Sequence, residues 1–187
     1  MSALQVPLSA ILAHHARQSP GRTALLLDDA AVSYDELDAR SNRRARLMAT
    51  LGVGLDDFVT VALPNGLEFY ETIFAIWKLG ATPNIVAAKL ARPEMEAILD
   101  LVRPKLFVGT PPSPGVPVLS GGSEQLDRFS ADPLPAAVAS HWKAMTSGGS
   151  TGLPKVIVDA APAMRDPTEG FLCQQPGDTI LNPGPLY

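Results

Sequence analysis

The chain has 187 residues, of which 46% are hydrophobic and 18% charged, a mixture typical of one globular domain with a real core. Its formal net charge of −4, without a basic cluster, argues against nucleic acid or an anionic membrane as partner. Because no apolar run approaches the roughly 20 residues that span a bilayer, and no charged region precedes residues 6–13, we expect a cytoplasmic protein without a membrane span. The lone Cys173 excludes an internal disulfide, and the histidines lack ligand spacing, so no metal site is predicted.

The first predicted elements are a β-hairpin and a helix. Two β-prone runs, residues 23–27 and 31–34, form the hairpin. Ser33 and Glu36 form a capping box that opens the helix, and Gly52 ends it. Apolar spacing predicts that one face of the helix is shared by Leu37, Ser41, Ala45 and Met48. Acidic residues early and basic residues later match the helix dipole, and we interpret the arginines as a solvated face: Arg40, Arg43, Arg44 and Arg46.

An alternation of strands and helices follows. Strands are predicted at residues 58–63, 82–86 and 105–109, and helices at residues 66–79 and 93–102. The connections are long enough for parallel, right-handed crossovers. Apolar residues cover more than one side of the first helix, so we expect it to be buried on more than one side. The predicted fold class is α/β, a layered parallel βαβαβ sheet with flanking helices.

The remaining chain divides by composition. Glycine and proline dominate the connection after the βαβαβ unit, and proline recurs through an irregular tail. Further strands are predicted at residues 142–146, 155–159 and 178–182. The predicted regions are the hairpin and βαβαβ unit (1–110), a Pro/Gly-rich loop (111–140), a phosphate-loop hairpin (141–160) and the tail (161–187).

The most informative motif occupies residues 146–156 and reads T-S-G-G-S-T-G-L-P-K-V. Its glycines let the backbone curl with N–H groups inward, and its hydroxyls and Lys155 complete a cradle for a polyphosphate. A Walker A loop is excluded because Lys155 follows Pro154 and precedes Val156, which has no hydroxyl for Mg²⁺. Strands flank the loop, so a backbone nest rather than a helix dipole must hold the anion. The alternative is a plain flexible turn.

The string S-T-G-L-P-K resembles the phosphate-loop signature of the adenylate-forming superfamily, which comprises acyl-CoA synthetases, adenylation domains of peptide synthetases and luciferases. Three other segments resemble family motifs in the family's order: R-T-A-L with V-S-Y-D-E-L, then W-K-L-G-A, then G-P-L-Y. The loop spelling, without a glycine after the lysine, looks most like certain acyl-CoA synthetases. The resemblance implies that the chain is the first subdomain of the adenylate-forming N-terminal domain.

The resemblance also implies a reaction and a binding site. A carboxylic-acid substrate attacks ATP, aided by Mg²⁺, to give an acyl-adenylate, and coenzyme A then displaces AMP, as in fatty acid metabolism. The ATP phosphates would bind Thr146, Ser147, Gly148, Gly149, Ser150, Thr151, Gly152 and Lys155. Tyr187 would border the acyl or adenine pocket. No catalytic residue is assigned in this chain, because the family's remaining machinery lies beyond Tyr187.

Two departures from the commoner loop pattern predict slow adenylation. Gly148 stands where the family usually has serine, and Val156 stands where glycine is common.

Two alternatives remain open. Beside the acyl-CoA synthetase interpretation, the chain could be a non-catalytic nucleotide-phosphate-binding fragment, or part of a peptide-synthetase adenylation domain that uses a carrier-protein thiol. The expected partners are the carboxylic acid, the remaining half of the enzyme and, as a further option, a second copy in a homodimer. A subdomain on its own should expose apolar surface.

Overall fold

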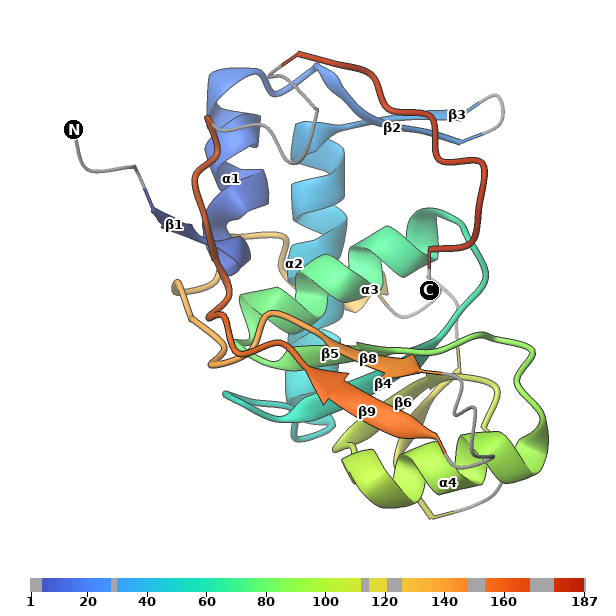
Figure 1. Cartoon of the computed structure of the whole chain (residues 1–187). Coiled ribbons are helices and arrows are strands. Elements are labelled where there is room, and N and C mark those ends of the chain that lie inside the picture. Colours follow the sequence, from blue (N-terminus) through green and yellow to red (C-terminus); the bar gives the residue numbers. More distant parts are fainter. Residues whose placement is uncertain are drawn as a thin grey trace.

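The computed structural model describes residues 5–27, 30–111, 115–120, 126–147, 154–168 and 177–186. Its helices are α1 (Leu8–Gln18), α2 (Tyr34–Thr50), α3 (Leu67–Lys78) and α4 (Arg92–Val102), with a short 3-10 turn η1 (Leu126–Arg128). Its strands are β1 (Val6–Pro7), β2 (Thr23–Leu27), β3 (Ala30–Ser33), β4 (Phe58–Ala62), β5 (Thr82–Ile85), β6 (Leu106–Gly109), β7 (Val118–Leu119), β8 (Ala144–Ser147), β9 (Lys155–Val158) and β10 (Met164–Arg165) (Figure 1).

A six-stranded sheet with the order β7-β6-β4-β5-β8-β9 forms the centre of the structure. The neighbours from β7 to β8 are parallel, and β9 pairs antiparallel with β8. After β5 the chain passes back across β4 to reach β6, so α3 and α4 cover opposite faces of the sheet (Figure 1). The predicted α/β class with a parallel βαβαβ unit is therefore confirmed.

Two apolar clusters lie on the two faces of this sheet. In β6, Leu106 and Val108 join the cluster beneath α2 and α3, whereas Phe107 points into the cluster beneath α4. All three side chains are fully buried. Such alternation in a strand covered on both sides explains why β6 reads as a continuous apolar run.

The predicted hairpin and the following helix are confirmed as β2, β3 and α2. The Ser33 hydroxyl oxygen accepts a hydrogen bond from the Glu36 N–H at 3.4 Å, so Ser33 caps the start of the helix as expected. The reciprocal half of the predicted capping box is not seen, since the Glu36 carboxylate pairs with Arg40. The predicted inner face is buried at every position: Leu37, Ser41, Ala45 and Met48. Helix α1 was not predicted, because Pro7 at its N-cap gives no side-chain capping signal.

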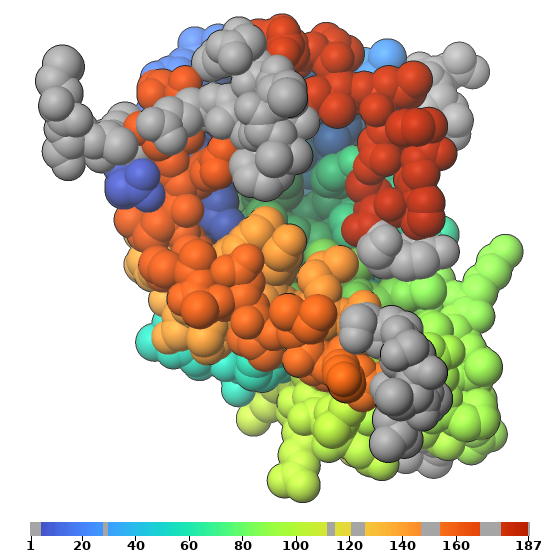
Figure 2. Space-filling model, in the orientation of Figure 1, coloured from blue at the N-terminus to red at the C-terminus, as the bar shows by residue number. Residues whose placement is uncertain are grey.

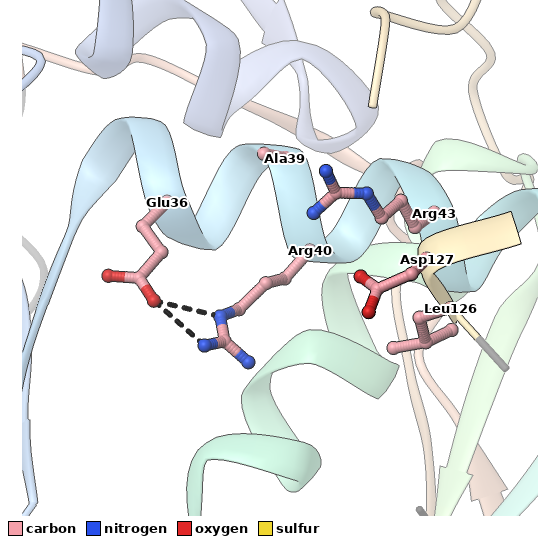
Figure 3. A pocket seen from close by; sticks show the side chains of 6 residues that line it. All are labelled: Glu36, Ala39, Arg40, Arg43, Leu126 and Asp127. Atoms are coloured by element: carbon pink, nitrogen blue, oxygen red, sulfur yellow. Dashed lines mark hydrogen bonds and ion pairs between the residues drawn. The ribbon is translucent and has the colours of Figure 1, made fainter. Parts of the chain in front are cut away.

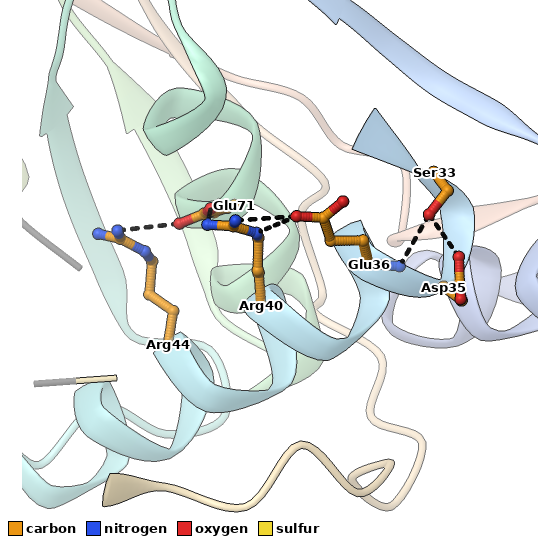
Figure 4. Close-up of polar contacts among 6 residues, drawn as sticks. All are labelled: Ser33, Asp35, Glu36, Arg40, Arg44 and Glu71. Carbon is orange, nitrogen blue, oxygen red and sulfur yellow. Dashed lines mark hydrogen bonds and ion pairs between the residues drawn. The ribbon is translucent and has the colours of Figure 1, made fainter. Parts of the chain in front are cut away.

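The predicted solvated face of α2 is wrong for Arg44, which is 1% exposed. Arg44 pairs with Glu68 at 3.1 Å and with Glu71 at 3.0 Å, and both carboxylates belong to α3. Arg40 bridges Glu36 and Glu71 in the same network (Figure 4). Arg40 and Arg44 thus bind α2 to α3. The sequence around these arginines does not show that α3 supplies carboxylates at this contact.

The regions predicted as irregular contain small exceptions. Strand β7 and turn η1 lie within the predicted Pro/Gly-rich loop. The strand predicted at residues 178–182 is wrong, since these residues pair with no strand, and Ile180 and Leu181 are exposed. A β-prone run forms a strand only where a sheet offers it an edge. Within the described ranges, no helix is long and apolar enough to cross a membrane.

Candidate functional site

Strands β8 and β9 frame the predicted phosphate loop. Because β8 runs parallel to β5 and β4, it ends at the carboxyl edge of the sheet. Strand β9 returns antiparallel, and its register places Lys155 directly opposite Ser147. The two strands predicted around the loop are therefore confirmed to within two residues at each end. Ligands of open α/β sheets bind at this edge, and β8 ends there.

The described residues bring only part of the predicted phosphate site together. Thr146 pairs with Val156, and Lys155 is exposed at the mouth of the hairpin. The other predicted loop residues lie outside the described residues: Gly148, Gly149, Ser150, Thr151 and Gly152. Tyr187 lies outside them too. Phosphate binding by this set therefore stays a prediction.

The segment that leads into β8 is held by side chains from distant parts of the chain. The Asp56 carboxylate accepts hydrogen bonds from the Ser140 N–H at 2.7 Å and from the Ser140 hydroxyl at 3.0 Å. The Thr82 hydroxyl donates to the His141 carbonyl at 2.8 Å. These contacts fix the backbone just before β8, because one partner precedes β4 and the other begins β5.

The W-K-L-G-A segment at the end of α3 continues this anchoring. The Trp77 indole N–H donates to the Trp142 carbonyl at 2.8 Å, and the Lys78 ammonium pairs with Asp38 at 2.7 Å. Burial lowers the pKa of Lys78 from its ordinary value, while Asp38 opposes that shift. Gly80 has a φ of +68°, and a Cβ there would lie 2.7 Å from the Leu55 side chain, which explains the glycine in this motif.

A buried polar ladder joins the middle of the sheet to β8. The Thr60 hydroxyl donates to the Asn84 side-chain oxygen at 3.0 Å, and the Asn84 amide donates to the Ala144 carbonyl at 3.4 Å. Thr60 and Asn84 are fully buried. Sequence reasoning missed Asn84, because only the pairing of β5 with β8 reveals what its side chain contacts.

The G-P-L-Y segment contacts the loop between β4 and α3. The Asn65 side-chain amide donates to the Gly184 carbonyl at 2.8 Å, and its oxygen accepts from the Leu186 N–H at 3.0 Å. This loop also lies at the carboxyl edge of the sheet, since β4 is parallel to β8 through β5. Sequence reasoning did not find Asn65 either.

A polar cavity of about 300 Å³ lies between α2 and η1 (Figure 3). It is lined by Glu36, Ala39, Arg40, Arg43, Leu126 and Asp127. The Arg40 guanidinium is already committed to Glu36 and Glu71, and Asp127 sets a negative charge beside Arg43. Both signs of charge are balanced here, and the cavity does not include the hairpin, so it is not the phosphate site.

A second, apolar hollow of about 380 Å³ lies beside α3. Tyr70, Phe74 and Trp77 from α3 form one wall, with Leu25 and Trp142 opposite. Figure 2 shows this face of the molecule, with the tail of residues 177–186 in red at its rim. Among the described residues, no group of three or more His, Cys, Asp or Glu side chains could hold a metal ion.

Comparisons with known proteins agree with this architecture. Residues 12–187 match the family described as AMP-binding enzyme. Pseudomonine synthase PmsE of Pseudomonas entomophila is 28% identical over 81% of this chain, and the chain spans 29% of that protein. A dimodular nonribosomal peptide synthase of Bacillus subtilis is 29% identical over 75% of the chain, which spans 6% of it.

A solved structure shows the same fold. The NpsA N-terminal subdomain of Klebsiella oxytoca superposes with a TM-score of 0.71 at 20% identity, covering 81% of this chain and 41% of that one. The expected place of this fold in the N-terminal subdomain of adenylate-forming enzymes is thereby confirmed. The chain spans well under half the length of each of these three proteins.

Proposed function

The chain belongs to the AMP-binding enzyme family, and we propose that it holds the β- and γ-phosphates of ATP in the loop between β8 and β9. The observation that carries this proposal is the register pair of Ser147 and Lys155 at the carboxyl edge of the sheet. A glycine-rich loop that starts and ends at this pair would have its backbone N–H groups and the Lys155 ammonium available to one ligand. That combination suits a compact polyanion.

The proposed role of this site is to stabilise the leaving group. When a carboxylate oxygen attacks the α-phosphorus of ATP, the bond to the pyrophosphate oxygen breaks and negative charge grows on pyrophosphate. The ammonium of Lys155, the loop hydroxyls and the loop N–H groups would bind that charge where it develops. The anchored segment before β8 would keep these donors from shifting during the step.

Adenylate-forming enzymes use Mg²⁺ together with ATP. At such sites the ion is held by one or two carboxylates and by the phosphates of the nucleotide. We assign no residue of this chain to the metal, and the proposal for this chain concerns the phosphates alone.

In the second proposed step a thiolate attacks the acyl carbonyl of the adenylate, and AMP leaves to give a thioester. The loop spelling supports coenzyme A as the thiol. A carrier-protein thiol is the second candidate, supported by the similarity to a nonribosomal peptide synthase. We propose that the enzyme is formed by this chain together with a further adenylate-forming part, because the relatives are much longer.

Replacing Lys155 by alanine tests the phosphate site. We expect the ATP affinity of the assembled enzyme to fall about tenfold, because one charged hydrogen bond to phosphate is lost. Affinity for AMP should stay unchanged, since AMP lacks the β- and γ-phosphates. Both constants are measured by isothermal titration calorimetry.

Lys105→Ala is the matched control. Lys105 is also exposed, and its N–H pairs with the Phe58 carbonyl at the opposite, amino edge of the sheet. This variant should bind ATP like the original chain. Equal loss of ATP and AMP affinity in Lys155→Ala, or no loss at all, would overturn the phosphate assignment.

The thiol is identified by product analysis of the assembled enzyme with ATP, a panel of carboxylic acids and coenzyme A. An acyl-CoA thioester supports the first candidate. Acid-dependent exchange of pyrophosphate into ATP without any thioester to free coenzyme A supports the carrier-protein candidate. Faster exchange in a Gly148→Ser, Val156→Gly variant would support the proposal that these two departures slow adenylation.

A further inference from the structure

Asn65 grips the main chain of the G-P-L-Y segment through both ends of its side-chain amide. Its nitrogen donates to the Gly184 carbonyl at 2.8 Å, while its oxygen accepts from the Leu186 N–H at 3.0 Å. The two contacts join residues about 120 positions apart in the chain, as their separations of 119 and 121 show. The pattern imitates one rung of a β-ladder, with a side chain in place of a neighbouring strand.

The position of Asn65 just after β4 relates this contact to the expected ligand crevice of the sheet. Asn65 lies between β4 and α3, where the chain leaves the central strand at its carboxyl edge. The crossovers through α3 and α4 diverge to opposite faces around β4, so its end borders the topological switch point of the sheet. In open α/β sheets the ligand crevice forms at that point.

Within the described residues 177–186, apolar contact is found near the end of the tail. Ile180 is 59% exposed and Leu181 is 86% exposed, so the described residues before the grip have little apolar contact. Leu186, in contrast, packs against the main apolar cluster. The Leu186 N–H donates the hydrogen bond that the Asn65 side-chain oxygen accepts. The polar grip and the apolar contact therefore act on the same residue and fix where the chain enters Tyr187.

We propose that Asn65 is a positioning residue for the carboxylic-acid side of the active site. This inference rests on the proposed function and on the sequence-based expectation that Tyr187, at the end of the G-P-L-Y segment, borders the acyl or adenine pocket. Asn65 does not touch the reacting atoms; it holds the backbone of residues 184–186 against the end of β4. The loop of β8 and β9 then binds the phosphates, and the Asn65 grip places the opposite wall of the crevice.

The chemistry of the two contacts explains why an amide is suited to this position. The Gly184 carbonyl needs a donor and the Leu186 N–H needs an acceptor, and an asparagine amide supplies both. In Asn65→Asp the carboxylate still accepts from Leu186 but repels the Gly184 carbonyl. In Asn65→Ala both contacts are lost. The two variants therefore separate the donor from the acceptor.

Hydrogen exchange of the Leu186 amide tests the grip in the 187-residue chain, independently of any activity. We expect the amide to exchange about tenfold faster in Asn65→Ala and by a smaller factor in Asn65→Asp, which keeps the acceptor. Gln18→Ala removes an exposed amide at the end of α1 and should leave this rate unchanged. Equal exchange in the original chain and Asn65→Ala would overturn the grip.

Steady-state kinetics of the assembled enzyme test the positioning role. We expect Asn65→Ala to raise KM for the carboxylic acid about three- to tenfold while KM for ATP stays unchanged. A parallel rise in both constants, or no change in either, would overturn the positioning role.

Failure of the proposed function is distinguishable from these outcomes. If the original enzyme formed no acyl-adenylate, the kinetic role of Asn65 would fall with it. The exchange result would still decide whether the grip exists.

Discussion

At the scale of single residues, the site depends on side chains that bind distant main-chain groups. Asp56 and Thr82 hold the segment before β8, and Asn65 holds the segment before Tyr187. Each lies at the end of a regular element or in the connection beside one, and each binds backbone that belongs to none. A hydrogen bond of this kind contributes about 1 kcal/mol to stability. Its larger effect is on where an otherwise irregular segment lies.

His15 should make stability depend on pH in the weakly acidic range. Burial lowers its pKa below the ordinary 6.5, and the positive charges of His14 and Arg22 lower it further. Below pH 6.5 the unfolded chain therefore takes up a proton that the folded chain still refuses. Stability falls as the pH drops from 6.5 to the lowered pKa, and this contribution levels off below it.

Thermal unfolding of the original chain and His15→Gln between pH 7.5 and 5 measures this effect. The midpoint should fall more steeply in the original chain, because the variant removes the titrating ring that lies 5.1 Å from Tyr34. Parallel pH profiles would show that His15 does not titrate differently in the two states.

At the scale of elements, the contact between α2 and α3 is unusual because it is both buried and charged. Arg44 and Glu71 are 2% and 3% exposed in their side chains, and they lie 3.0 Å apart. Such a pair adds little over an apolar contact, but removing one partner leaves the other charge buried without compensation. The pair therefore sets which surfaces of the two helices meet.

Glu71→Ala should destabilise the chain by about 3–5 kcal/mol, because Arg44 would lose its most buried partner. Arg44→Met combined with Glu71→Leu should restore most of that loss. The measurement is urea unfolding of the three chains. Glu96→Ala removes an exposed pair on α4, with side chains 67% and 40% exposed, and should cost less than about 1 kcal/mol. Similar losses for Glu71→Ala and Glu96→Ala would contradict this account.

Sequence reasoning predicted the elements whose signals are local. The capping box at Ser33, the apolar spacing of α2 and the glycine-rich loop between two strands all depend on neighbouring residues. The residues that sequence reasoning misjudged depend instead on contacts with distant parts of the chain. Arg44 was misread because its partners lie on another helix. Asn65 and Asn84 were missed because the backbone carbonyls to which they donate lie 119 and 60 residues away. Helix α1 was missed because it lacks a side-chain cap.

At the scale of the whole molecule, the hollow beside α3 is an apolar feature of the described surface. Tyr70, Phe74 and Trp77 are only partly buried there, although α3 is otherwise a core helix. Removing such apolar surface from water lowers the free energy by roughly 25 cal/mol per Å². The sequence-based expectation that a subdomain exposes apolar surface is met by this hollow.

The 187-residue chain should therefore bind the dye ANS and self-associate at high concentration. Phe74→Glu should reduce both, because it places a charge in the wall of the hollow. Leu101→Glu changes a leucine of α4 that is 59% exposed outside the hollow and should reduce neither. Dye fluorescence and sedimentation velocity measure these properties, and circular dichroism checks that each variant is folded. Equal effects of the two substitutions would refute a localised patch.

The seam between β5 and β8 also sets the order in which the molecule assembles. Strands β8 and β9 are neighbours in sequence and can close as a hairpin within about 10 μs. Docking that hairpin on β5 joins Asn84 to Ala144, 60 residues further on. Among the described residues, the other ladder pair between these two strands is Ile85 with Met145. Non-local parallel pairing is slow because chain entropy is lost before contacts form. The refolding chain should thus complete its proposed phosphate site last, after the two helical layers have already collapsed on the central strands.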